Sequence, residues 1–143
     1  MAEKKRYFEN VNENEEIPPF EVTVSRTHIV KYAGAGGDFN PVHHDEEFAR
    51  AVGLPSVFAM GLMHGGFLSK TLTDWAGGGT VKRYKIRFAT IVWPKDTITC
   101  KGTVIKKYQE GRENLVDLEI SVVNQNGEKA ITGEATVLLP SKS

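Results

Sequence analysis

The feature that most constrains the fold is a change of hydrophobic period along the chain. Residues 61–76 carry apolar side chains at helical spacing over more than one face, which predicts a mostly buried helix. Four later runs are rich in β-branched residues and largely alternate apolar with polar side chains, as strands do: 81–90, 96–108, 113–124 and 129–139. A sheet with one apolar face must cover that face, and only this helix is apolar enough. We therefore predict an α+β domain, a long buried helix wrapped by a curled antiparallel sheet.

Short turns separate the four predicted strands. The three turn signals are Trp93-Pro94-Lys95-Asp96, Gln109-Glu110-Gly111-Arg112 and Asn124-Gln125-Asn126-Gly127. Such short connections predict that the four strands form an antiparallel meander, joined by an N-terminal strand at 20–25. We expect a single domain over residues 1–143. Residues 1–19 are polar and end in two prolines, so we expect them to form a loosely held lead-in.

The predicted helix contains unexpected glycines in its first turns. Gly61, Gly65 and Gly66 each lower helix propensity by roughly 1 kcal/mol relative to alanine. Glycines at these positions indicate that another backbone, or a substrate, approaches the helix closely there. The run Gly77-Gly78-Gly79 is expected to end the helix.

A second glycine-rich stretch leads into a cluster of polar residues. Gly34-Ala35-Gly36-Gly37 offers backbone shapes that side chains would forbid, and it precedes Asp38, Asn40 and His43. Pro41 restricts the turn between them. A short helix capped by Ser25 or Thr27 is expected before this segment, and a second, 46–52, capped by Asp45 and stopped by Gly53, after it.

Charge and cysteine content exclude several classes of protein. The chain has 18 basic and 18 acidic residues, so it lacks the basic excess of a nucleic-acid-binding protein. Its single cysteine, Cys100, cannot form an internal disulfide and fits a reducing compartment. No run resembles a signal peptide or reaches membrane-spanning length, so we expect a soluble, cytoplasmic protein.

The polar cluster and the helix start together resemble a known family. The shared features are Tyr32, the run Gly37-Asp38-Phe39-Asn40-Pro41-Val42-His43, Phe48-Ala49, Gly61-Leu62-Met63, Thr73-Asp74-Trp75 and Arg87-Phe88. This pattern resembles the MaoC-like (R)-specific enoyl-CoA hydratases, and especially the single-domain (3R)-hydroxyacyl-ACP dehydratase subunits. The resemblance implies a hot-dog fold and reversible hydration of trans-2-enoyl thioesters. It also implies a homodimer, or a heterodimer with a paralogous hot-dog subunit, with two helices packed side by side.

Hydration of an enoyl thioester requires a base for water, a proton for the α-carbon and stabilisation of an enolate-like oxygen. Asp38 is the candidate base, and His43 the group that shares the water and shuttles the proton. Asn40, held by Pro41, is expected to orient either Asp38 or His43 through its amide. Gly61 opens the buried helix and is expected to supply backbone N–H donors to the thioester oxygen.

The remaining site residues concern the acyl group. Phe58 is a candidate lining residue of an acyl tunnel, and Pro41 and Met60 are candidate substrate contacts. Many members of the family carry a histidine where this chain has Met60, so its substrate preference is expected to differ if that histidine tunes the pocket. His64, one turn into the helix, is a candidate to compensate. No cofactor is expected beyond the CoA or phosphopantetheine arm that the substrate itself carries.

Several alternatives remain open on the sequence. Asp38 and Asn40 are also common turn formers. His43-His44-Asp45 resembles a metal cluster, but adjacent side chains diverge and a catalytic metal needs about three ligands. A hot-dog thioesterase would need a carboxylate that acts at the thioester carbonyl. A non-catalytic acyl-binding subunit would be expected to have lost the Asp38–His43 pair, which this chain retains.

Overall fold

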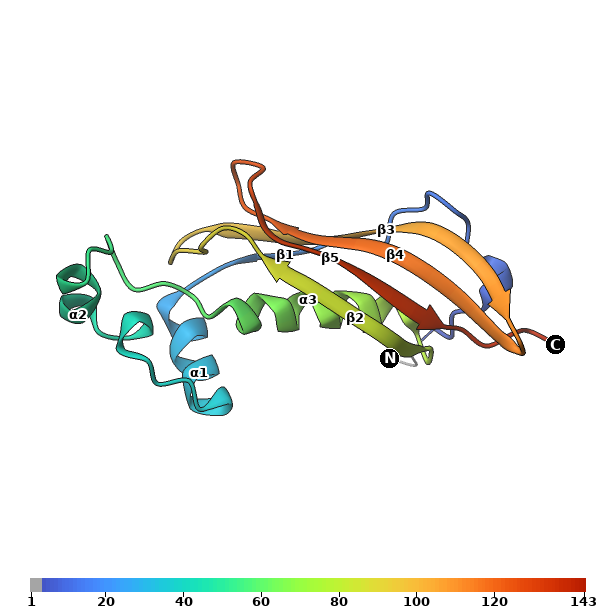
Figure 1. Cartoon of the computed structure of the whole chain (residues 1–143), viewed down its shortest axis with the longest axis horizontal. Helices are drawn as coiled ribbons and strands as arrows, with labels where there is room; N and C mark the ends of the chain where they lie inside the picture. Colours follow the sequence, from blue (N-terminus) through green and yellow to red (C-terminus); the bar gives the residue numbers. More distant parts are fainter. Residues whose placement is uncertain (1–3) are drawn as a thin grey trace.

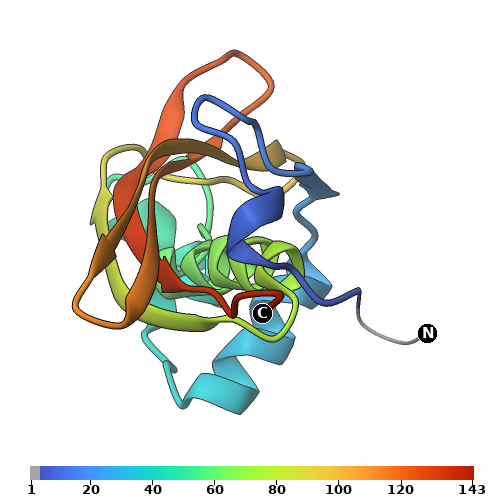
Figure 2. The same cartoon turned by 90° about the vertical axis from the view of Figure 1, so that its right-hand side faces the viewer.

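A computed structural model describes residues 4–143 and shows a five-stranded antiparallel sheet curled around one long helix (Figures 1 and 2). The strands are β1 (Phe20–Thr23), β2 (Thr80–Phe88), β3 (Thr97–Glu110), β4 (Glu113–Val123) and β5 (Lys129–Leu138). The helices are α1 (Arg26–Gly36), α2 (Glu46–Ala51) and α3 (Gly61–Ala76), with single 3₁₀ turns η1 (Phe8–Asn10) and η2 (Pro41–His43). The prediction of a long helix wrapped by a curled sheet is confirmed.

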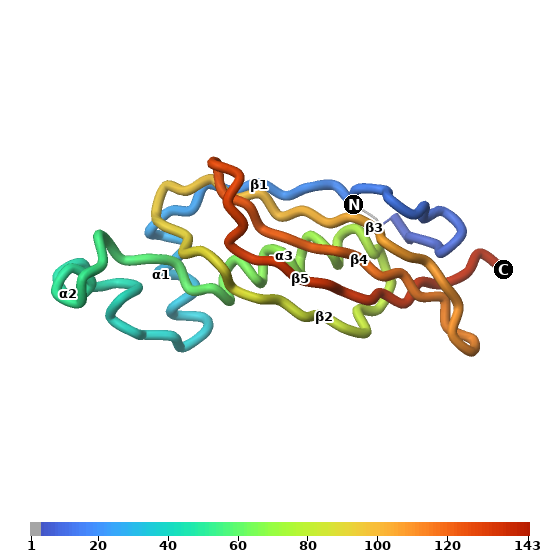
Figure 3. The backbone as a smooth tube through the Cα atoms, turned by 45° about the horizontal axis from the view of Figure 1, so that its top comes forward, coloured from blue at the N-terminus to red at the C-terminus, as the bar shows by residue number. Residues whose placement is uncertain are grey.

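The order of the strands differs from the predicted meander. The sheet runs β1-β3-β4-β5-β2, so the meander is correct for β3 to β5 and wrong for β2, which crosses over to pair with β5 (Figure 3). The cause is the connection after β2. Its turn is tied to the end of β1, because Val24 N–H donates to the Asp96 carbonyl at 2.8 Å and Lys95 N–H donates to the Val24 carbonyl at 2.7 Å. β1 and β2 therefore form opposite edges of the curled sheet.

Helix α3 buries one broad side against the sheet and leaves the other open. Met63, Leu68, Leu72 and Trp75 belong to the buried core, as predicted. Leu62 is 63% exposed, so the expectation that it is buried is wrong for the isolated chain. The helix is thus covered on its sheet side only.

Side chains of β2 explain two of the three glycines in α3. A Cβ atom on Gly61 would lie 2.7 Å from the Phe88 ring, and one on Gly65 would lie 3.0 Å from Ile86. These close approaches come from side chains, whereas another backbone or a substrate was expected. Gly66 has nothing within 4 Å of an added Cβ and faces the open side.

The predicted loose lead-in is wrong for residues 4–19, whereas residues 1–3 lie outside the described part of the chain. Val11 and Ile17 are buried in the core, and the segment before β1 runs beside β3 (Figure 3). The Lys107 ammonium donates to the carbonyls of Phe8 and Val11, at 2.8 Å each. These contacts hold the segment in place, because exposing a buried apolar side chain and breaking a charge-assisted hydrogen bond both cost free energy.

The segment between β1 and α3 projects beyond one end of the sheet and carries the predicted short helices (Figure 1). Both caps are confirmed: Ser25 Oγ accepts from His28 N–H, and Asp45 Oδ1 accepts from Phe48 N–H. The glycine-rich stretch is mostly helical, contrary to expectation, and only Gly37 has a left-handed φ, of 72°. Across the described residues, no helix has the length and apolarity needed to cross a membrane.

Candidate active site

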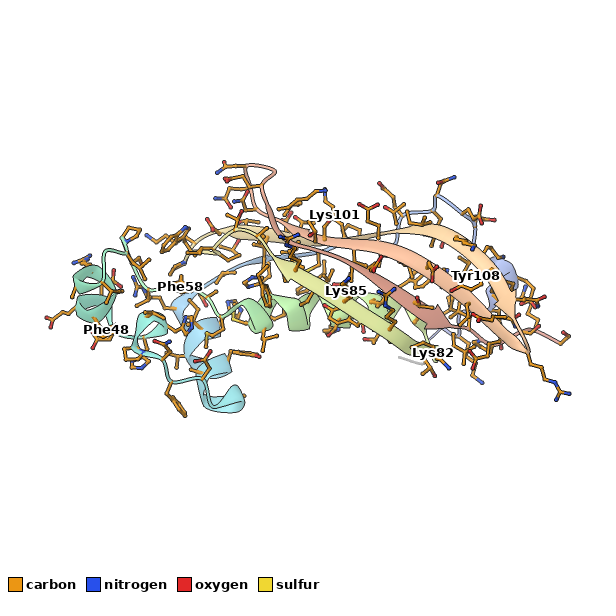
Figure 4. The ribbon with its side chains drawn as sticks, in the orientation of Figure 1. Phe48, Phe58, Lys82, Lys85, Lys101 and Tyr108 are labelled. Atoms are coloured by element: carbon orange, nitrogen blue, oxygen red, sulfur yellow. The ribbon has the colours of Figure 1, made fainter. Side chains whose placement is uncertain are left out.

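A cavity of about 450 Å³ lies beside the N-terminal end of α3. Three segments that are distant in sequence enclose it, namely 32–43, 58–64 and 88–92. Figure 4 shows Phe58 in the chain that leads from α2 to α3. Of the predicted site residues, all but one line this cavity: Asp38, Asn40, His43, Phe58, Met60 and Gly61. The exception is Pro41, which starts the η2 turn and does not line the cavity.

Asp38 and His43 face each other in this cavity. His43 Nε2 lies 3.7 Å from Asp38 Oδ2, with His43 8% exposed and the Asp38 side chain 45% exposed. The other ring nitrogen, Nδ1, is 2.6 Å from the Phe58 carbonyl oxygen. A carbonyl only accepts, so Nδ1 carries the hydrogen, and a neutral His43 presents the lone pair of Nε2 towards Asp38. Two acceptors then face each other across a gap that is too long for a direct hydrogen bond. A water molecule, which donates twice, matches this arrangement.

Asn40 holds the turn that carries both of these side chains. Its backbone N–H donates to Asp38 Oδ1 at 3.3 Å, and its amide oxygen accepts from Val42 N–H at 3.2 Å. The amide was expected to orient Asp38 or His43 directly. The structure instead has it cap η2, so that the side chain of Asn40 acts on His43 through the backbone.

The neighbouring polar residues serve other partners. His44 Nε2 lies 3.0 Å from the Phe39 carbonyl, and Asp45 caps α2. The hypothesis that His43, His44 and Asp45 form a metal cluster therefore fails on geometry. Over residues 4–143, no group of three His, Cys, Asp or Glu side chains lies in a metal-binding arrangement.

The start of α3 brings backbone donors to the cavity. Met60 is the N-cap and makes no side-chain cap hydrogen bond. The N–H groups of Gly61 and Leu62 have no acceptor within the helix and lie at the positive end of the helix dipole, whereas Met63 N–H donates to the Met60 carbonyl at 2.9 Å. Gly61 lines the cavity, so these donors lie within reach of a bound anion or carbonyl oxygen.

Sequence reasoning missed the wall that residues 88–92 form. Phe88, Ala89, Thr90, Ile91 and Val92 all line the cavity, and Ala59 N–H donates to the Val92 carbonyl at 2.9 Å. These residues lie in and after a strand end, roughly fifty positions from the polar cluster, and no local pattern links the two. Tyr32, Val42, Ala59 and Leu62 were also missed as lining residues, whereas His64 was named only as a candidate to compensate for Met60.

Comparison with known proteins places the chain in a family. The model of the MaoC like domain matches residues 9–136. Over 138 residues, the chain is 30% identical to an (R)-specific enoyl-CoA hydratase of Rhodospirillum rubrum, with 95% of this chain and 93% of that protein covered.

Solved structures agree with this match. Unliganded R-hydratase PhaJ1 from Pseudomonas aeruginosa superimposes with a TM-score of 0.87 at 22% identity, covering 95% of this chain and 86% of that one. A chain of the ChsH1–ChsH2 complex from Mycobacterium tuberculosis gives a TM-score of 0.79 at 27% identity, covering 90% and 98%. The predicted hot-dog fold is confirmed. The chain belongs to the MaoC-like domain family, the family of (R)-specific enoyl-CoA hydratases and MaoC-like dehydratases.

Proposed function

We propose that this protein is a hydro-lyase that reversibly hydrates trans-2-enoyl-CoA thioesters to (R)-3-hydroxyacyl-CoA. The observation that carries the proposal is the Asp38–His43 pair, whose facing oxygen and nitrogen lie 3.7 Å apart in the cavity that Gly61 also lines. The R. rubrum relative is named for the same reaction and the same stereochemistry, which supports both parts of the proposal.

In the proposed reaction, one water molecule donates hydrogen bonds to Asp38 and to Nε2 of His43. The water oxygen attacks C3 of the enoyl group and one of its protons passes to the pair, which delivers a proton to C2. The product has gained H at C2 and OH at C3, and the thioester bond remains intact. Positioned proton transfer of this kind typically contributes about 10²–10⁴-fold to a rate.

Negative charge develops on the thioester oxygen as C3 is attacked. We propose that the N–H groups at the start of α3, beginning with Gly61, receive this oxygen. Donors that are already aimed at the developing charge need no reorganisation during the reaction, and loss of one such donor typically lowers turnover by about 10²–10³-fold.

The proposal is tested with crotonyl-CoA and two substitutions. Asp38→Asn and His43→Gln should each lower kcat for hydration by at least about 10²-fold, while circular dichroism and thermal unfolding remain those of a folded protein. Two neighbours provide matched controls outside the cavity. Asp45→Asn makes the same chemical change and keeps an N-capping side chain, and His44→Gln alters the adjacent histidine; both should hydrate crotonyl-CoA at close to the parent rate. If either site variant retains the parent rate, the assigned roles are wrong.

We also propose that a second copy of this chain covers the open side of α3. Leu62 and Phe88 are 63% and 51% exposed beside the cavity, and Gly66 leaves room on the same helix for close approach. Exposed apolar groups gathered next to a site are typical of a protein interface, and closed two-fold symmetry is the commonest arrangement. The mass in solution should be that of a dimer, and Leu62→Glu should produce monomers. A monomeric parent protein would contradict this proposal and would favour a heterodimer with a paralogous subunit. A solved structure similar to this chain is likewise part of a complex of two differently named proteins, ChsH1–ChsH2.

A further inference from the structure

One peptide unit connects the Asp38–His43 pair to a segment of the chain far away in sequence. Its carbonyl, that of Phe58, lies 2.6 Å from Nδ1 of His43. Its N–H, that of Ala59, donates to the Val92 carbonyl at 2.9 Å. Both polar groups of the unit are therefore paired. The path runs from the Val92 backbone through one planar peptide to the His43 ring, whose other nitrogen faces Asp38.

The residues of this path are shielded from water. Val92 is 0% exposed, Ala59 2% and His43 8%. Hydrogen bonds are stronger where the dielectric constant is low, and bonds in a chain polarise one another. When Ala59 N–H donates, resonance in the peptide increases the negative charge on the Phe58 oxygen. The short contact to His43 agrees with an acceptor that is strengthened in this way.

The peptide is held in place on both sides. Phe58 N–H donates to the Val42 carbonyl at 3.3 Å, which ties it to the η2 turn. Trp93 N–H donates to Asp96 Oδ2 at 2.9 Å, which fixes the chain just beyond the 88–92 wall. Rotation of the Phe58 carbonyl away from the histidine would also turn the next N–H away from its acceptor, because the two groups share one plane.

This arrangement selects the nitrogen of His43 that carries the hydrogen. With the hydrogen on Nδ1, the Phe58 carbonyl is paired and Nε2 is an acceptor. In the other tautomer, the lone pair of Nδ1 would face the carbonyl oxygen at 2.6 Å and leave it without this donor. Loss of the donor to a buried acceptor destabilises the state in which it occurs. The proposed reaction needs the first tautomer, because Nε2 accepts a hydrogen from the attacking water.

We propose that Ala59 is a positioning residue of this site, whose N–H, held by the Val92 carbonyl, fixes His43 in the Nδ1–H tautomer through the Phe58 carbonyl. The inference rests on the proposed function and adds a backbone group that acts through His43. The 88–92 wall then has a second role besides enclosing the cavity. No side-chain motif marks this role, since Ala59 and Val92 contribute backbone atoms alone.

The test is Ala59→lactic acid, which exchanges the backbone N–H for an oxygen and keeps the methyl side chain. The exchange removes the bond to Val92 and makes the Phe58 carbonyl an ester carbonyl, a weaker acceptor. The kcat for hydration of crotonyl-CoA should fall by about fivefold to tenfold, the value of one buried hydrogen bond, with KM nearly unchanged. Ala49→lactic acid is the matched control and should keep the parent kcat. Ala49 is also buried, its N–H also donates to a carbonyl at 2.9 Å, and it does not line the cavity.

Nitrogen NMR of the histidine rings measures the tautomer without any turnover. Near neutral pH the parent protein should show His43 protonated on Nδ1 and bare on Nε2, with its signals identified by their absence in His43→Gln. Ala59→lactic acid should add a measurable share of the Nε2–H tautomer, and Ala49→lactic acid should not. Phe58→Leu removes a ring whose centre lies 4.8 Å from that of His43 but keeps the peptide, so it should retain the parent tautomer.

Three results would overturn the inference: hydrogen on Nε2 in the parent protein, an Ala59→lactic acid variant that keeps the parent tautomer or the parent kcat, or a tautomer that changes in Phe58→Leu alone. The two readouts separate this inference from the proposed function. A tautomer that shifts in the ester variant of a protein that hydrates no enoyl-CoA would refute the hydratase while supporting the path through the peptide. Hydration by an ester variant with the parent kcat and tautomer would support the hydratase and refute the role of Ala59.

Discussion

The burial of His64 predicts how the stability of the protein depends on pH. The pKa of its imidazole is about 4 in the folded chain and about 6.5 when unfolded, because burial disfavours the charged ring. The unfolded state therefore binds the proton first, and the native state loses stability as the pH falls below 6.5 towards 4. From pH 6.5 to pH 5 the unfolded ring titrates over about 1.5 pH units, each worth about 1.4 kcal/mol. The free energy of unfolding should fall by about 2 kcal/mol from this residue alone.

Urea unfolding at pH 7 and pH 5 measures this loss in the parent protein and in His64→Leu. Every other titrating group is common to the two proteins, so the difference between their pH dependences isolates His64. The parent should lose about 2 kcal/mol more than the variant between the two pH values, with similar urea m-values.

The same variant makes a second prediction at pH 7. Because leucine removes a buried nitrogen that has no partner, His64→Leu should be at least as stable as the parent at that pH. Equal pH dependence of the two proteins would refute the reasoning, since it would mean that His64 accepts a proton in the folded state without penalty.

Three further predictions concern two glycines and the turn at the site. Gly133→Ala should cost at least about 1–3 kcal/mol in thermal unfolding, because its Cβ would collide with the Lys85 carbonyl and no side-chain movement can relieve a backbone clash. Gly34→Ala, in a helix with nothing within 4 Å of the new Cβ, should instead gain up to about 1 kcal/mol, and a loss there would contradict the structure. Asn40→Ala should cost about 1 kcal/mol and lower crotonyl-CoA hydration, because the turn that holds His43 loses its cap. Unchanged hydration in that variant would show that other contacts position His43.

The helices and strands of this fold could be predicted from local sequence patterns. Their arrangement could not, because it depends on pairing between segments that are distant in the sequence. The bounds of α3 were predictable because its apolar residues follow a helical period between glycines at both ends. The pairing of β2 with β5 was not predictable, since it depends on the turn at Asp96 binding to Val24, which directly follows β1 and lies far earlier in the chain. The packing of residues 4–19 was missed for a similar reason, because their polar composition hides the two buried residues Val11 and Ile17.

The residues of the candidate site also fall into two groups: those that local sequence predicts and those that reach the site only through the fold. Asp38, Asn40 and His43 lie within six residues, so their proximity could be predicted from the sequence, and the cavity does bring them together. The indirect action of Asn40, through the backbone of Val42, depends on the geometry of a single turn. The 88–92 wall could not be predicted, since it reaches the site only after the sheet has curled around α3.

The most direct measurement is the fate of crotonyl-CoA in water labelled with heavy oxygen, followed by mass spectrometry. The account predicts 3-hydroxybutyryl-CoA in the (R) configuration, with the label on C3 and the thioester intact, and no such product from Asp38→Asn. Free acid with the label in its carboxyl group would identify a thioesterase. If the parent protein leaves crotonyl-CoA unchanged, Asp38 and His43 do not have the function proposed for them.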